Sequence, residues 1–573
     1  MRKLGWTLLA LLVAAPLHAQ ERWDLTGGRV SVRFNAGLMR DLGIRVGPAV
    51  RIDKDGYAPY EIGAQGKLVA VAPGSIFRTV DMGELSLAGG PRLSWRGDSA
   101  TLRGARILPG SEPNTFTITD ADGQLLFTAD HEHFTVDRKA RTLRLYNLDL
   151  RLSPELAARL GEPRQAGLPV GVLEIRTQAA IPRGAVEQPL GACTTPEWGN
   201  PDNDVSLINM SQVSQVARGN GVVAIAPSAV LKNVGVTDVP WQQKFSPPAP
   251  PYNTDQHPYL IWNLYRVSNG RIEQLAASGL KHAFVTVNSN CGCPGGSILW
   301  VNCEDTYGVS TNNSTGSLSP RTEITAHTGV WQRCGSIFDP DCNGVQNTAP
   351  GFTGPEDPRR LNVPETELQV AGAQYYFDSW YVVRDDVNIY NTMAYRTITP
   401  TLTTSWSFTP MGTQRAGAVV DAWVDPVTPG PNADNKKLNT GEGQLTLAGR
   451  ATDVGGGRWR YEYALMNHDF DNGITTFQVP LPAGATVTNT YFHDVDRNPS
   501  TDWVPVMITG GIRFQPPKNA RTPVEYFQDW GTLYNFGFEV DAAPTAAGGS
   551  VATLGVLEGF TRTITIATMG PVQ

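Results

Sequence analysis

Histidine, cysteine and long apolar runs are scarce in this sequence of 573 residues. It contains eight histidines and six cysteines, and charged residues make up only 18% of the chain. After the N-terminal segment no stretch reaches 18 consecutive apolar residues, which argues against a helical membrane span. The net charge of -7 argues against the overall positive field that nucleic-acid-binding proteins usually carry. We therefore expect no nucleic-acid partner and no membrane span.

Common catalytic motifs are also missing. The sequence has no GxSxG, HExxH or GxxxxGK[ST] motif, and no GxGxxG motif follows a predicted strand. Their absence argues against an α/β-hydrolase nucleophile elbow, a zincin site and a phosphate-binding P-loop. A catalytic group assembled from distant residues is still compatible with the sequence.

The N-terminus has the pattern of a secretory signal peptide. Arg2 and Lys3 precede an apolar run at residues 8–15, and the small residue Ala19 follows at the expected cleavage position. No cysteine lies near that position, which argues against a lipid anchor. We expect residues 1–19 to be removed and the protein to be secreted or periplasmic.

The rest of the chain is rich in turn-forming residues, with 59 glycines and 42 prolines. Short runs with a period of two, separated by Gly, Asp and Asn, predict antiparallel sheets. We expect an all-β protein with several β-sandwich domains in tandem, an immunoglobulin-like sandwich at the C-terminus and little helix. The predicted units are an N-terminal β domain at 20–178, a linker at 179–204, a central β region at 205–443 and a C-terminal sandwich at 444–573.

Two local elements can be predicted in detail. A short helix is expected from Pro154 to Leu160, because Ser153 can cap its start and Gly161 can end it. A hairpin is expected in the central region, with strands at 259–267 and 271–277, because Asn269-Gly270 favours a tight hairpin turn. A third strand is expected at 282–287.

All six cysteines lie beyond the predicted signal peptide. An even number of cysteines in an exported chain favours disulfides. Cys291 and Cys293 are separated by one residue and are not expected to pair with each other, so each should reach another cysteine, with Cys303, Cys334 and Cys342 as the expected partners. Six cysteines allow fifteen pairings, and the sequence does not choose among them. The alternative is a soft-metal site made by the thiolates of Cys291, Cys293 and Cys303.

The central region contains a set of histidines and charged residues that could form a catalytic site. His257, His282 and His327 are candidate ligands for copper or zinc. His282, Glu323, Arg321 and Asp305 are the candidate catalytic residues, with Glu323 as a general base and Arg321 holding an anion. The alternative is that the histidines lie at hairpin edges and that Arg321 pairs with Glu323 or Asp305.

Two oxygen-rich turns suggest calcium, and one histidine pair suggests a metal. Asp339, Asp341 and Asn343 follow the opening DxDxNG pattern of a calcium loop, although Pro350 stands where an EF-hand has glutamate. Asp494 and Asp496 have similar spacing. His131 and His133 would share one face of a strand and could bind zinc or copper, although an ordinary strand is the simpler interpretation.

Several motifs resemble those of an unannotated family of large secreted bacterial proteins. They are HP at 257–258, NGR at 269–271, LKHAF at 280–284, CGC at 291–293, CED at 303–305, SPRTE at 319–323, FHDVD at 492–496 and WGTLYNF at 530–536. The resemblance covers the chain from about Cys193 to the C-terminus and implies export but no particular activity. It also marks His493, beside Asp494 and Asp496, as a candidate metal ligand.

Two functions are compatible with these observations. The first is an exported β protein that binds an extracellular or cell-surface polymer. Disulfides would stabilise it, and calcium is a candidate structural ion. The second is a secreted metal-dependent enzyme, a hydrolase or oxidoreductase, that uses the central histidines and carboxylates on a small-molecule substrate. Side chains that converge in a cleft would favour the enzyme.

Overall fold

The structure is a computed structural model that describes residues 21–48, 51–187, 193–199, 202–253, 255, 257–517, 526–557 and 562–572. The predicted signal peptide lies outside these residues, and the predicted linker lies only partly within them. Strands make up 50% of the chain and helices 7%, so the all-β prediction is confirmed. No described helix has the length and apolar character needed to cross a membrane.

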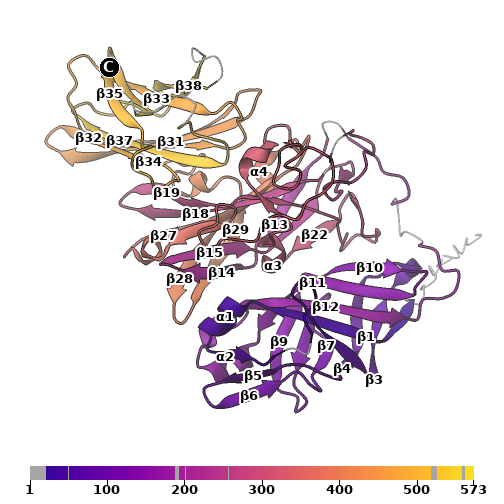
Figure 1. The fold of residues 1–573 in the computed structure, drawn as a ribbon. Coiled ribbons are helices and arrows are strands. Elements are labelled where there is room, and N and C mark those ends of the chain that lie inside the picture. The colour runs from indigo at the N-terminus through magenta and orange to yellow at the C-terminus, as the bar shows by residue number, and fades with distance from the viewer. Residues whose placement is uncertain are drawn as a thin grey trace, which may run out of the picture.

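The N-terminal unit is a closed eight-stranded barrel, drawn in indigo and purple in Figure 1. Its strands, in order around the barrel, are β11 (Thr142–Leu152), β12 (Pro169–Ala179), β1 (Arg22–Phe34), β3 (Ala58–Val71), β4 (Thr79–Leu87), β7 (Arg106–Pro109), β8 (Phe116–Thr119) and β9 (Leu125–Asp130). The pairing of β9 with β11, with Asp130 opposite Asp149, closes the barrel. Inward-facing apolar residues such as Trp23, Leu68 and Phe127 form its core.

Shorter elements complete the barrel unit. They are β10 (His133–Asp137), which pairs with β11, the small sheet of β2 (Arg45–Val46), β5 (Arg92–Trp95) and β6 (Asp98–Thr101), the helices α1 (Ala36–Asp41) and α2 (Pro154–Leu160), and the 3-10 turns at Pro73–Ser75 and Pro163–Gln165. Helix α2 has the predicted bounds. Ser153 accepts a hydrogen bond from the Leu156 N–H, and Gly161 adopts the left-handed conformation after the last turn.

The central unit is built on a ten-stranded sheet. The path through the sheet is β23 (Leu318–Ser319), β20 (Leu280–His282), β18 (Tyr259–Ser268), β27 (Gln374–Val382), β28 (Met393–Leu402), β29 (Trp406–Ala416), β14 (Val213–Gly219), β15 (Val222–Pro227) and β26 (Leu361–Pro364), with β19 (Arg271–Ala277) paired to β18. The predicted hairpin is confirmed as β18 and β19, with Asn269 and Gly270 both at positive φ. The predicted third strand is displaced, because β20 ends at His282.

A three-stranded sheet shares a core with the ten-stranded sheet. It consists of β13 (Val205–Asn209), β16 (Ala229–Asn233) and β22 (Glu304–Tyr307). The smaller elements of this unit are β17 (Val239–Pro240), β21 (Ile298–Leu299), β24 (Ile324–Thr325), β25 (Val330–Trp331), α3 (Val309–Asn312), α4 (Ile389–Thr392) and 3-10 turns at Arg321–Glu323, Glu365–Gln369 and Val419–Ala422.

The C-terminal unit is a sandwich of two five-stranded sheets, drawn in orange and yellow in Figure 1. One sheet is β30 (Ala433–Asn439), β31 (Gln444–Gly455), β32 (Arg458–Asn467), β37 (Thr532–Val540) and β34 (Val487–His493). The other is β35 (Val504–Ile508), β36 (Gly511–Gln515), β33 (Ile474–Pro480), β38 (Ser550–Val556) and β39 (Thr563–Thr568). Rings of both sheets meet in the core, where Phe477 stacks on Phe536 with centroids 4.3 Å apart.

The sandwich and the central sheet also share a core. Strand β32 alternates, so that Tyr461 and Tyr463 face the inside of the sandwich while Ala464 and Met466 pack with Tyr259 of the central sheet. The aromatic residues at 375–377 and 380–381 are buried in the core of the central unit.

Three disulfides link loops of the central unit, so the prediction of disulfides is confirmed. The partner of Cys293 differs from the expectation, because it is Cys193 and not Cys303, Cys334 or Cys342. Cys193 pairs with Cys293, Cys291 with Cys303, and Cys334 with Cys342. Because all six sulfur atoms are bonded, Cys291, Cys293 and Cys303 provide no thiolate. Three disulfides are consistent with an oxidising compartment.

Candidate functional site

His257 and His282, two of the predicted metal ligands, form a hydrogen-bonded pair. His257 Nε2 lies 2.7 Å from His282 Nδ1, and His282 Nε2 lies 2.9 Å from Ser319 Oγ. Burial lowers the pKa of His257 to about 3 and that of His282 well below its usual value, so both rings are neutral. A neutral imidazole has one N–H, so the two hydrogen bonds run in the same sense, either from His257 through His282 to Ser319 or in reverse, and the tautomer of His282 decides which.

These two hydrogen bonds involve both ring nitrogens of His282. Trp331, Tyr259 and Phe338 pack around the two rings, and Ser319 is fully buried. His257 Nδ1 has no hydrogen-bond partner among the described residues, and His257 lines a cavity of about 10 Å³. A cavity of that size is close to the smallest that holds one water molecule, which could bond to this nitrogen.

Arg321 is predicted from the sequence to hold an anion. In the structure its guanidinium instead donates hydrogen bonds to oxygen atoms of the protein. Its Nε donates to the Ser278 carbonyl (2.7 Å), Nη1 to the Gly531 carbonyl (2.9 Å) and Nη2 to Asn263 Oδ1 (2.8 Å). Gly531 has φ +72°, and a Cβ there would lie 2.5 Å from Arg321 Nη1, so glycine is required. Arg321 therefore joins the central sheet to the sandwich.

Glu323 lies two residues after Arg321 in the same 3-10 turn. It accepts hydrogen bonds from the Ile337 N–H (2.7 Å) and from Trp331 Nε1 (3.3 Å). Burial raises its pKa. Its two oxygens thus hold the segment that carries Trp331, which covers the histidine pair.

Asp305 lies on another sheet, in β22. Its Oδ1 accepts from the Val287 N–H (3.0 Å), and burial raises its pKa to about 7. Nearby, the fully buried Lys281 places Nζ 2.9 Å from the centroid of the Tyr307 ring. The structure therefore does not bring Asp305 into contact with the His257–His282 pair; it pairs with the backbone at 287.

His327 faces the sandwich. Its Nδ1 lies 3.1 Å from Asp469 Oδ2, and this hydrogen bond raises its pKa. Both backbone N–H groups of Ala326 and His327 donate to Asp471. His327 is thus part of the contact between the central unit and the sandwich.

The two oxygen-rich turns are closed by their own hydrogen bonds. Asp339 is buried and accepts from the Gly344 N–H, while Asp341 Oδ2 accepts from Asn343 Nδ2 at 2.8 Å. In the second turn, Asp494 Oδ1 accepts from the Asp496 N–H at 3.0 Å. Burial, followed by the charges of Asp496 and Asp502, raises the pKa of Asp494 to about 7, and burial lowers that of the adjacent His493. Calcium or another metal at these residues stays a prediction.

Two groups of at least three potential metal ligands lie close together in the described part of the chain. One consists of Cys291, Cys293 and Cys303, which are in disulfides, and the other of Asp130, His131 and Asp149. The second group surrounds a guanidinium: Arg151 Nε lies 2.7 Å from Asp130 Oδ1, and Arg151 Nη2 lies 3.2 Å from Asp149 Oδ2. Arg151 provides the positive charge that a metal would otherwise supply.

A cavity of about 640 Å³ lies between the barrel and the disulfide-bearing loops of the central unit. Residues 77–79, 112–115, 130–132 and 134 of the barrel form one wall. Residues 230, 287–292, 304 and 306 of the central unit form the other. Its size is typical of small-molecule and cofactor sites.

Glu132 is the most unusual group in this cavity. It is 4% exposed, and burial raises its pKa well above the usual value. With its amide nitrogen turned toward the acceptors, Asn114 donates to Glu132 Oε1 and to the Arg78 carbonyl, each at 2.9 Å. Glu132 Oε2 has no hydrogen-bond partner in the described residues.

Arg78 and two phenylalanines complete the barrel wall. Arg78 Nη1 donates to the Cys293 carbonyl at 2.8 Å, and Nη2, although buried, has no partner in the described structure. Phe77 and Phe134 meet edge to face with centroids 4.8 Å apart. The wall thus combines two aromatic rings with two polar atoms that have no hydrogen-bond partner in the described structure, the donor Arg78 Nη2 and the carboxyl oxygen Glu132 Oε2.

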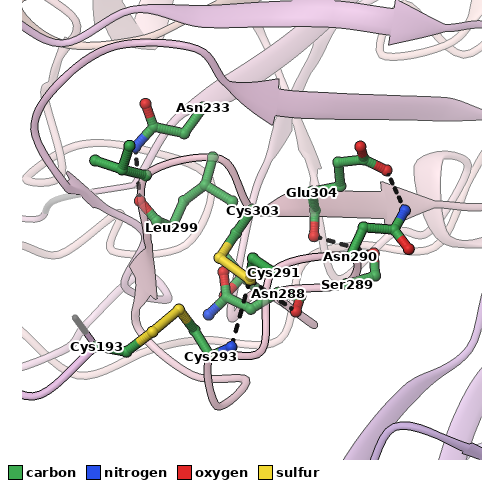
Figure 2. The surroundings of a disulfide bond; sticks show 12 residues. Cys193, Asn233, Asn288, Ser289, Asn290, Cys291, Cys293, Leu299, Cys303 and Glu304 are labelled. Carbon is green, nitrogen blue, oxygen red and sulfur yellow. Dashed lines mark hydrogen bonds between the residues drawn. A yellow bond between two sulfur atoms is a disulfide. The ribbon is translucent and has the colours of Figure 1, made fainter. Parts of the chain in front are cut away.

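The disulfides hold the opposite wall in place. Figure 2 shows the Cys193–Cys293 and Cys291–Cys303 bonds side by side, with Asn290 pointing toward Glu304. Asn290 Nδ2 donates to Glu304 Oε2 at 2.6 Å, and the Cys293 N–H donates to Cys291 Sγ. This wall is therefore built from loops that the disulfides fix.

The sequence drew attention to His131 and His133 but not to Glu132 between them. The expectation of a strand is wrong, because β9 ends at Asp130, His131 has φ +59° and β10 begins at His133. His133 packs against Tyr307 and Phe284 of the central unit, so the two imidazoles do not share a site. A glutamate flanked by two histidines gives no sequence signal for burial.

The chain matches no model of a known protein family and no curated protein sequence.

Proposed function

We propose that this protein is exported and binds a neutral, hydroxyl-rich extracellular polymer, such as a polysaccharide, in the cavity between the barrel and the central unit. The observation that carries the proposal is that two buried polar atoms without a hydrogen-bond partner in the described residues, Glu132 Oε2 and Arg78 Nη2, belong to residues in the wall of this cavity. Buried polar groups are nearly always hydrogen-bonded, so a ligand that both donates and accepts would satisfy these two groups. A sugar hydroxyl does both.

The remaining features of the cavity agree with a sugar. The Phe77–Phe134 pair provides an apolar face against which a sugar ring can pack. Two acidic groups elsewhere in the wall are paired: Asp130 with Arg151, and Glu304 with Lys232 at 3.5 Å. Export is supported by the three disulfides and by the predicted signal peptide.

We favour binding over the metal-dependent enzyme. His257 and His282 direct their facing nitrogens at each other, and Asp305 and His327 have other partners. Elemental analysis of the purified protein tests both metal expectations. One equivalent of zinc or copper would favour the enzyme, whereas calcium alone would favour a structural ion in a binding protein.

The direct test is polysaccharide binding by the full-length, disulfide-bonded protein. Affinity electrophoresis against a panel of neutral and acidic polysaccharides should show retardation by a neutral polymer. Glu132→Ala should weaken that binding by about tenfold or more, because ligand hydroxyls lose their partner. Glu84→Gln, an exposed change on the barrel, should bind like the unmodified protein.

Two results would contradict the proposal. One is the absence of retardation by every polymer in the panel. The other is unchanged binding in both Glu132→Ala and Arg78→Met, which would place the polymer elsewhere on the protein.

A further inference from the structure

A second cavity, of about 370 Å³, lies where helix α1 and strands β1 and β12 of the barrel meet β14 and α3 of the central unit. Its ionisable wall residues are Arg33, Arg218, Arg360 and Asp41. Arg218 is neutralised by a two-pronged ion pair with Glu365, with N–O distances of 2.9 and 2.7 Å. The wall then contains two cations without an ion pair to a described residue, Arg33 and Arg360, and one carboxylate, Asp41.

Arg360 is the most buried of these arginines. Three arginines in the described residues are less than about one-tenth exposed: Arg151 (6%), Arg359 (5%) and Arg360 (9%). Arg151 pairs with Asp130, and Arg359 pairs with Asp357 through two bonds of 2.8 Å. Arg360 forms no ion pair with any described residue.

The hydrogen bonds of Arg360 orient its guanidinium without neutralising it. Nε donates to Asn313 Oδ1 and Nη1 to the Gly354 carbonyl, each at 3.0 Å, and the group lies 3.7 Å from the centre of the Phe352 ring. Nη2 makes no hydrogen bond to a described residue. Burial lowers the pKa of Arg360 to about 10, so it stays protonated at neutral pH.

A buried charge without a counter-charge is costly, and proteins normally pair it. The guanidinium plane matches oxyanions, which accept two parallel N–H bonds. The charge of Asp357 acts on Arg360, but this carboxylate is already paired with Arg359. Asp41 makes no ion pair with Arg360, and its Oδ2 accepts from Gln215 Nε2 at 3.4 Å.

We propose that this second cavity is a binding site for an oxyanion (a sulfate, phosphate or carboxylate group) held by Arg360. The site is separate from the proposed polymer cavity and shares no wall residue with it. The anion would neutralise Arg360 between the barrel and the central unit. The proposal does not depend on polymer binding.

Calorimetric titration of the full-length protein with inorganic sulfate, inorganic phosphate and acetate tests this site. We expect saturable binding of at least one of these anions, weakened about tenfold or more in Arg360→Gln. Arg103→Gln, at an exposed barrel position, should leave the affinity unchanged. Preference for acetate over sulfate and phosphate would indicate a carboxylate-bearing ligand, and the reverse would indicate a sulfated or phosphorylated one.

Arg360→Lys and Asn313→Ala give a second measurement if Arg360→Gln does not fold. The lysine variant keeps the charge and should retain part of the affinity, whereas loss of Asn313 frees the guanidinium and should weaken binding. Equal anion affinity in Arg103→Gln and in all the site variants, or the absence of saturable binding to the unmodified protein, would overturn the proposal.

Discussion

The Asp149 carboxylate of the barrel lies 2.7 Å from the backbone nitrogen of Val309 in the central unit and accepts its hydrogen bond. The next N–H, of Ser310, donates to the same carboxylate at 2.9 Å. Asp149 is fully buried and also pairs with Arg151. One carboxylate therefore joins the closing strand of the barrel to the start of α3.

We predict that Asp149→Ala lowers the free energy of unfolding by about 3 kcal/mol, because it leaves two backbone N–H groups without a partner and removes one of the two carboxylates that pair with Arg151. Urea unfolding followed by tryptophan fluorescence measures the change. Asp98→Asn, which breaks an exposed pair with Arg159, should change little. Equal urea midpoints for the two variants would contradict a stabilising role for Asp149.

The buried histidines should make the fold sensitive to acid. Burial lowers the pKa of His257 and His133 to about 3 and of His468 to about 4 in the folded protein. In the unfolded chain these groups titrate near 6.5, so below that pH the unfolded state binds more protons. Stability is therefore present above about pH 6.5 and is lost as the pH falls below it.

His257→Gln tests this dependence, because glutamine can hydrogen-bond to His282 but binds no proton. Between pH 7 and pH 5 the unmodified protein should lose about 2 kcal/mol more stability than the variant. His327→Gln is a control of opposite sign: Asp469 raises the pKa of His327, so this variant should lose more stability in acid than the unmodified protein. Parallel pH profiles for all three proteins would show that these histidines do not titrate as the structure implies.

Arg321 is predicted to act as a structural group. Arg321→Lys should lower the free energy of unfolding by about 2–4 kcal/mol, because a single ammonium cannot reach the Ser278, Gly531 and Asn263 oxygens together. Arg103→Lys, at an exposed barrel position, should cost much less. If the two variants unfold at the same urea concentration, Arg321 does not join the central sheet to the sandwich as described.

The disulfides should differ in their contribution to stability. Cys193–Cys293 closes a loop with a sequence separation of 100, and Cys334–Cys342 one of 8. Loop-closure entropy predicts a loss of about 4–5 kcal/mol on replacing the first pair with serine and about 2–3 kcal/mol on replacing the second. Unfolding of the two double variants in urea compares them, and a larger loss for the short loop would contradict the entropic account.

Local signals in the sequence predicted local structure well. Ser153, Pro154 and Gly161 define α2 because capping depends on residues within one turn, and Asn269-Gly270 defines a hairpin because a tight turn needs two positive φ values. The disulfide prediction followed from cysteine count and predicted export.

Long-range features could not be predicted in the same way. The pairing of Asp130 with Asp149 closes the barrel, but nothing in either strand specifies that partner. The cavity around Glu132 forms only where two units meet, so its residues are distant in the sequence and have no shared spacing. The residues proposed for the central site are distributed among the His257–His282 pair, β22 and the sandwich contact.

The Cys193–Cys293 bond also has a topological consequence. It encloses the segment between the two cysteines in a covalent ring that includes the first hairpin of the central unit. A protease cut anywhere inside this ring would leave the two fragments joined through sulfur. Such a nicked molecule would keep its full mass on a non-reducing gel and separate only after reduction.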